Sequence, residues 1–149
     1  MWKSLLPCFV LLFSLGCEED SDTIAACGTD CGSTPDHLSD CSADEGDPLD
    51  ILEGASLEGE TLTVSVTYSG GCEAHDYVLC LPAGGFSEGI PVGARLDIWH
   101  DAAGDYCEAV ETETLTFDIS SLVDDYIDQY GPEGTLRISI GSDQLDYVL

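Results

Sequence analysis

The chain has 149 residues, of which 30 are Asp or Glu and three are Lys or Arg, so its formal net charge at pH 7 is −27. Binding of nucleic acid through its phosphates is excluded as a function, because such contacts need clustered Lys and Arg side chains. The acidic residues are spread along the whole chain, which favours solubility or life in high salt over a divalent-cation site as their purpose.

Residues 1–16 have the features of a signal peptide. Lys3 precedes a mostly apolar stretch from Leu5 to Leu15, which is too short for a membrane-spanning helix of about 20 residues. A basic start, a short apolar centre and a small residue before the cleavage site are typical of secretory signals. We therefore expect the protein to be exported.

The end of this segment, Ser14-Leu15-Gly16-Cys17, resembles the lipobox of bacterial lipoproteins. In that family, signal peptidase II cuts before the cysteine, whose thiol carries a diacylglycerol with chains such as palmitate. Gly16 and Cys17 match the pattern, whereas Ser14 stands where Leu, Val or Ile is usual. The resemblance implies lipidation at Cys17 and anchoring to the bacterial cell envelope, at the outer membrane or cell surface. A plain secretory signal with an unmodified Cys17 is the alternative.

Residues 17–48 are rich in Asp, Glu, Ser, Gly and Cys and poor in large apolar side chains. Such a composition cannot bury enough surface to fold alone, so we predict an acidic, Cys-containing flexible tether before a domain at 49–149. An even number of cysteines after Cys17 indicates disulfides formed in an oxidising compartment. These six are Cys27, Cys31, Cys41, Cys72, Cys80 and Cys107.

The residues after 48 alternate between apolar and polar side chains, which is the period of half-buried strands. Strands are expected over 49–57, 61–68, 76–81, 94–100, within 106–119, 135–141 and 144–149. About seven short strands separated by Gly-rich turns predict an all-β fold, an immunoglobulin-like antiparallel β-sandwich.

Two local features qualify this pattern. Glu111 and Glu113 fall on the apolar face of their strand, so we expect a bulge or two short strands there. One short helix is expected near 121–130, with Ser120 or Ser121 as its N-cap and with Gly131 and Pro132 ending it.

One group of residues could carry chemistry. If Ala103 and Gly104 form a two-residue hairpin turn, His100 and Cys107 lie opposite each other on its two strands, with Cβ atoms about 5 Å apart. Cys72 and His75 follow the strand at 61–68 and would join that pair if their turn lies at the same end of the sandwich.

This group has two interpretations. The favoured one is a Cys72–Cys107 disulfide with no cofactor, in which the histidines are partly buried, hydrogen-bonded neighbours. The alternative is one zinc or copper ion bound by Cys72, His75, His100 and Cys107, because two thiolates and two imidazoles suit a tetrahedral site.

The motifs GGCxxHD and HDxxGDxCEA resemble those of a group of uncharacterised bacterial lipoproteins with a β-sandwich domain. The resemblance covers roughly residues 60–149 and implies a common fold and a shared site, with no activity attached. The matching residues are Cys72, His75, His100, Asp101, Gly104, Asp105 and Cys107. Cys80 lies outside these motifs, which makes it a candidate partner for a cysteine of the tether.

No catalytic motif with a stated mechanism occurs in the chain. Nucleophilic catalysis usually needs a histidine base, and the candidates are His37, His75 and His100. We therefore expect a non-enzymatic envelope lipoprotein, a binding or structural module whose partner is an envelope protein or a glycan. A metal-binding lipoprotein is the second hypothesis, and a hydrolase is less favoured.

Overall fold

The computed structural model describes residues 38, 41 and 46–149. The predicted signal peptide, the lipidation site Cys17, His37 and most of the predicted tether lie outside the described residues. Within the described part of the chain, no helix is both long and apolar enough to cross a membrane.

The described chain forms nine strands and one helix. In chain order they are β1 (Asp50–Ile51), β2 (Ser56–Glu58), β3 (Thr61–Gly70), β4 (Asp76–Cys80), β5 (Phe86–Ser87), β6 (Val92–Asp101), β7 (Ala109–Asp118), α1 (Ser120–Tyr130), β8 (Thr135–Ile140) and β9 (Asp143–Val148). The strands predicted from period-two alternation are all present, except that 49–57 splits into β1 and β2. The two-residue strand β5 was not predicted, because it is too short to show a period.

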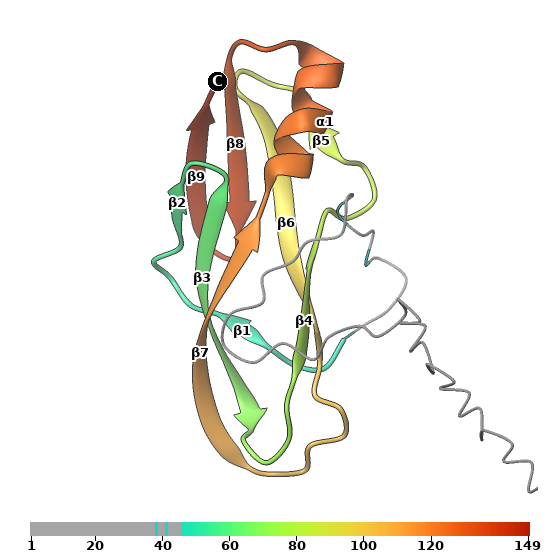
Figure 1. Ribbon diagram of the computed structural model, residues 1–149, viewed down its shortest axis with the longest axis vertical. Helices are drawn as coiled ribbons and strands as arrows, with labels where there is room; N and C mark the ends of the chain where they lie inside the picture. Colours follow the sequence, from blue (N-terminus) through green and yellow to red (C-terminus); the bar gives the residue numbers. More distant parts are fainter. Residues whose placement is uncertain (1–37, 39–40, 42–45) are drawn as a thin grey trace, which may run out of the picture.

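Two sheets pack against each other, which confirms the all-β sandwich (Figure 1). In the first sheet, β3 pairs with β1 and β2 on one side and with β7 on the other. The second sheet has the order β4-β6-β8-β9, with β5 also beside β6. The pair β6 and β8 is parallel, whereas the prediction was wholly antiparallel. The reason is that β7 and α1 lie between these strands in sequence and carry the chain back to the start of the sheet.

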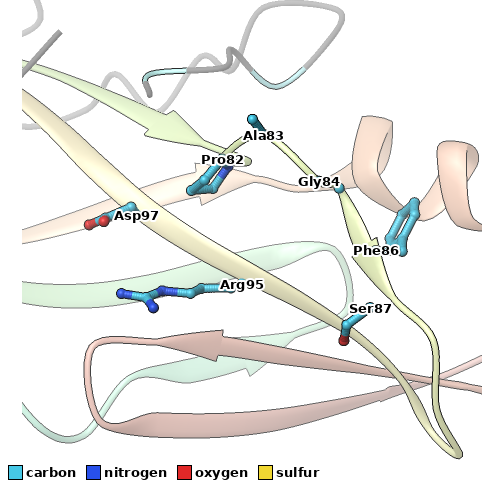
Figure 2. Close-up of a pocket in the computed structure, with 8 residues that line it drawn as sticks. Pro82, Ala83, Gly84, Phe86, Ser87, Arg95 and Asp97 are labelled. Carbon is cyan, nitrogen blue, oxygen red and sulfur yellow. The ribbon is translucent and has the colours of Figure 1, made fainter. Parts of the chain in front are cut away.

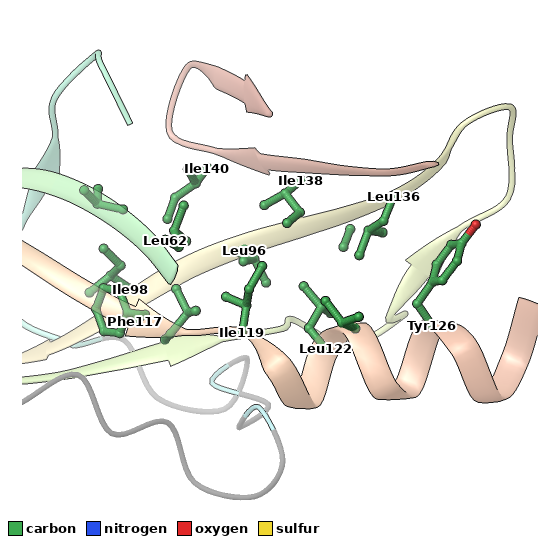
Figure 3. Packing of buried hydrophobic residues seen from close by; sticks show 14 of the residues in the cluster. Leu62, Leu96, Ile98, Phe117, Ile119, Leu122, Tyr126, Leu136, Ile138 and Ile140 are labelled. Atoms are coloured by element: carbon green, nitrogen blue, oxygen red, sulfur yellow. The ribbon is translucent and has the colours of Figure 1, made fainter. Parts of the chain in front are cut away.

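The core lies between the sheets and extends under α1 (Figure 3). Alternate residues of β3 are completely buried, as the sequence pattern predicted. The helix contributes Leu122, Val123 and Tyr126 from one face, which closes the end of the sandwich where β8 begins. The fully buried side chains are led by Leu62, Leu79, Leu96, Ile119, Leu122, Leu136, Ile138 and Ile140.

The helix begins with a different cap from the predicted serine. Its N-cap residue is Ile119, which makes no side-chain capping bond. The carboxylate of Asp118 instead accepts a 2.8 Å hydrogen bond from the backbone N–H of Ser120, so an acid just before the helix satisfies one of its free donors. The predicted end is confirmed, because Gly131 adopts φ 97° and its N–H bonds the carbonyl of Ile127 at 2.8 Å.

The predicted bulge in β7 does not exist. β3 and β7 form ten consecutive antiparallel pairs, from Thr61 with Asp118 to Gly70 with Ala109. Glu113 therefore shares a face with the core residues of β7 and needs polar partners inside the sandwich. Those partners are tyrosines that belong to the candidate site.

Candidate functional site

The residues singled out in the sequence gather at one end of the sandwich, opposite α1. β3 ends there, β4 begins there, and the chain passes from β6 to β7 through residues 102–108 (Figure 1). We refer to the side chains of Tyr68, His75, Tyr77, His100, Asp105 and Glu113, together with the Cys72–Cys107 disulfide, as the histidine cluster.

Cys72 and Cys107 are joined by a disulfide with a Cα–Cα distance of 6.0 Å. The two residues continue the one-to-one register of β3 and β7, which pairs Gly70 with Ala109. The favoured disulfide interpretation therefore has a simple basis in the first sheet. It covalently closes the two strands just beyond their last backbone pair.

The predicted pairing of His100 with Cys107 is wrong. A tight turn at Ala103 and Gly104 is present, with positive φ at both residues and a bond from the N–H of Asp105 to the carbonyl of Ala102 at 2.8 Å. The chain does not return along β6 after this turn, because β4 already occupies that place and pairs Tyr77 with His100. β7 crosses to the other sheet instead.

Asp105 holds the two loops of this end together. One carboxylate oxygen accepts bonds from the backbone N–H groups of Cys72 at 2.8 Å and Glu73 at 3.1 Å, and it lies 3.3 Å from Nε2 of His75. The other oxygen accepts a 2.8 Å bond from the N–H of Cys107. These donors, led by the N–H of Cys107 and then that of Cys72, hold the pKa of Asp105 well below its usual range.

His75 and His100 bond to each other inside the domain. Nδ1 of His75 lies 2.8 Å from Nε2 of His100, and the two residues are 6% and 1% exposed. The ring of His75 packs directly on β3, since a Cβ added to Gly70 would lie 2.6 Å from its Cε1. On the far side, Nδ1 of His100 lies 3.3 Å from the backbone carbonyl of Asp47.

The outer partners of this pair are both acceptors, the carboxylate of Asp105 and the carbonyl of Asp47. Two neutral imidazoles carry two N–H protons, so they can make only two of the three contacts in the row. Each ring nevertheless faces a polar protein atom with both of its nitrogens. The row is thus built for hydrogen bonding within the protein.

Tyr68, Tyr77 and Glu113 form the inner part of the histidine cluster. Both tyrosine hydroxyls donate to one carboxylate oxygen of Glu113, at 3.2 Å from Tyr68 and 3.0 Å from Tyr77. Burial is the main reason that the pKa of each tyrosine is raised, so the hydroxyls remain donors. The ring of Tyr77 stacks on His100 at 5.1 Å, which links this group to the histidine row.

The segment before β1 is attached to the same end. The N–H of Asp47 bonds the carbonyl of His100 at 2.7 Å, and its carboxylate accepts a 2.8 Å bond from the N–H of Ala102. A Cβ on Gly46 would lie 2.7 Å from the carbonyl oxygen of His100, so the chain passes very close to β6. A second disulfide joins Cys41 to Cys80, as expected for a cysteine outside the recognised motifs.

The structure does not bring together the four ligands of the metal hypothesis. Both sulfurs are bonded to each other, and the facing nitrogens of His75 and His100 are occupied by their mutual contact. Among the described residues, the group that places one ligand atom each within 4.8 Å of the others is Cys72, Asp105 and Cys107. A sulfur in a disulfide is not a thiolate and is a poor metal ligand, so this oxidised group does not fit zinc or copper.

The sequence predicts part of the histidine cluster. It indicates Asp105 as a motif residue without a role, and it indicates Tyr68 and Tyr77 only as strand residues. Glu113 did give a signal, because an acid on an apolar face needs a buried partner.

No protein-family model matches the chain, and no curated protein is significantly similar to it. Two of the solved structures that match the chain do so over 76% of its length, each with a TM-score of 0.45. One is described as a toxin-related protein from Parabacteroides distasonis, with 20% identity, and the match covers 58% of that chain. The other is a protein of unknown function, DUF1344, from Bacteroides vulgatus, with 12% identity and 53% of that chain covered. The chain thus spans little more than half the length of either protein.

The carboxylate of Asp105 predicts a specific acid sensitivity. Because its pKa is lowered by folding, its stabilising effect is present above the ordinary Asp pKa of about 4 and is lost as the pH falls towards the lowered value. Asp105→Asn should be less stable than the parent at neutral pH, and its stability should depend less on pH in the acid range. Urea unfolding over a pH series measures both effects, with Asp76→Asn, an exposed acid at the start of β4, as control. Parallel pH profiles for parent and Asp105→Asn would contradict this role.

Proposed function

We propose that the protein is a non-enzymatic, extracytoplasmic binding module, exported and anchored to the cell envelope through a lipid on Cys17. Two disulfides, Cys41–Cys80 and Cys72–Cys107, support an oxidising compartment. The Cys41–Cys80 bond also joins the predicted tether covalently to β4 in the second sheet.

The observation that carries the non-enzymatic part of this proposal is the closure of the histidine row. A general base must reach the proton that it takes from a substrate. His100 is 1% exposed, both of its ring nitrogens face protein atoms, and one face of the ring is covered by Tyr77. The histidines therefore stabilise the fold from inside, and ligands bind on the outer surface of the sandwich.

Replacing His100 tests this structural role. His100→Ala should lower the free energy of unfolding by about 2–4 kcal/mol, because it leaves a cavity under Tyr77 and unpairs His75. Urea denaturation measures the loss, and Tyr106→Ala is the control, since Tyr106 is 95% exposed and should change stability by about 0.5 kcal/mol or less. A His100→Ala protein as stable as its parent would favour a catalytic role instead, since active-site groups often cost stability.

The anchor is tested separately. Cys17→Ser should move the protein from the membrane fraction to the soluble fraction, and Cys27→Ser should leave it with the membranes. Mass spectrometry of the mature N-terminus should find diacylglycerol on Cys17. A free, unmodified thiol at that position would refute the anchor while leaving export intact.

Metal binding through Cys72, His75, His100 and Cys107 remains the alternative, and it requires the Cys72–Cys107 disulfide to be reduced. The two proposals predict different thiol counts for protein isolated from its native envelope. The binding-module proposal predicts no free thiol at Cys72 or Cys107 and no stoichiometric zinc or copper. Two reactive thiols that are protected by one bound metal ion would favour the alternative.

A further inference from the structure

Among the described residues of this very acidic protein, Arg95 is the cation without an ion-pair partner. The described residues contain two arginines, and Arg137 makes a two-bond ion pair with Asp146 at 2.8 and 2.9 Å. Arg95 is exposed on the outer face of β6 and has no hydrogen-bond or ion-pair partner among the residues that the structure describes. With many carboxylates available in the chain, a guanidinium left open at the centre of a sheet is a candidate for ligand binding.

A depression of about 500 Å³ lies beside this guanidinium. Figure 2 shows Arg95 and Asp97 on β6, with Pro82, Ala83 and Gly84 on the neighbouring loop. The other lining residues are Gly85, Phe86 and Ser87. The volume falls in the range of small-molecule sites. The depression is open to solvent, so we expect weak binding with rapid exchange.

The loop beside β6 gives the depression a partly apolar and partly open wall. A Cβ added to Gly84 or Gly85 would meet no atom within 4 Å, so the loop backbone borders free space. The ring of Phe86 lies on the opposite face of the sheet, because Phe86 pairs with the buried Ala94 and makes edge contacts with Tyr126 at 6.0 Å and Tyr130 at 5.7 Å. On the face of Arg95, a small apolar group of a ligand can lie against Pro82 and Ala83.

The charges of the site select the kind of ligand. The net charge of −27 repels an anion from the whole surface, and a cation gains nothing from Arg95. A zwitterion is not repelled as a whole, and it can pair its carboxylate with Arg95 and its ammonium with Asp97. A guanidinium and a carboxylate can form two parallel hydrogen bonds, which makes this the stronger of the two contacts.

Arg95 and Asp97 are two residues apart on one face of β6, so their Cα atoms are separated by about 7 Å. A small molecule that carries both a carboxylate and an ammonium group can therefore contact both side chains, whether it is a single amino acid or a short peptide.

We propose that Arg95 and Asp97 form a site for a small zwitterion, an amino acid or a short peptide with free termini, in which Arg95 binds the carboxylate and Asp97 the ammonium. Pro82 and Ala83 line the space for its small side chain. This inference rests on the proposed binding role and names its ligand class. It involves none of the residues of the histidine cluster.

The proposal is tested by titrating the full mature protein with alanyl-alanine while the backbone amides are monitored by isotope-edited NMR. We expect saturable shifts at residues 82–87 and 95–97 with a Kd on the order of 1 mM. Alanyl-alanine amide and N-acetyl-alanyl-alanine should each bind at least about 10-fold more weakly, because each loses one of the two charge contacts. Free alanine keeps both charges, so comparing its affinity with that of alanyl-alanine distinguishes an amino-acid site from a peptide site.

Two matched variants locate the site. Arg95→Gln should weaken alanyl-alanine binding by about 10-fold or more, whereas Arg137→Gln, on the neighbouring strand of the same sheet, should leave it unchanged. Both positions are at the surface, so the fold is expected to survive. Absence of saturable binding by the parent, equal binding of the amide, or an unchanged Kd in Arg95→Gln would each overturn the proposal. The His100→Ala and Cys17→Ser experiments do not depend on Arg95, so failure of the ligand proposal is distinguishable from failure of the proposed function.

Discussion

The end of the sandwich opposite α1 depends on the hydrogen bonds that the carboxylate of Asp105 accepts. This carboxylate accepts hydrogen bonds from the backbone N–H groups of Cys72 and Glu73 on one loop and of Cys107 on the other. It also contacts Nε2 of His75, which lies further inside the domain. Its position in turn sets the row from His75 through His100 to the carbonyl of Asp47. A single side chain therefore links the first sheet, the second sheet and the segment that precedes β1.

This arrangement accounts for the unusual content of the cluster. Buried polar groups are costly unless each finds a partner, and here Glu113 has two hydroxyl donors while each imidazole has two polar neighbours. The Cys72–Cys107 disulfide closes the same end covalently and limits the freedom of the unfolded chain. We propose that a site so fully occupied by its own contacts stabilises the fold, and that ligands bind elsewhere, at the open surface around Arg95.

Much of the fold could be predicted from local alternation. The period of two predicted nearly every strand, and Gly131 marked the end of the only helix in the described chain.

The histidine cluster was harder to predict from the sequence, because its geometry depends on which strands pair. The residues around Ala103 and Gly104 do form the expected turn, and a local hairpin follows naturally from it. The pairing of β7 with β3, which begins about 50 residues earlier in the chain, carries no local signal. It is favoured because it buries Phe117 and Leu115 opposite Leu62 and Val64. Asp47 was missed for a related reason, since an acidic, Gly-rich segment gives no sign that its backbone bonds to β6.

The proposed role of the histidine cluster depends on His75 and His100 being bonded to each other and closed to solvent. The most direct measurement is a ¹H–¹⁵N correlation spectrum of the imidazole nitrogens in the folded protein at neutral pH. The structure predicts ring N–H protons that exchange slowly with water, with scalar or nuclear Overhauser connections between the two rings. Rapid exchange of every ring proton, together with the ¹⁵N shifts of free imidazole for both residues, would contradict it.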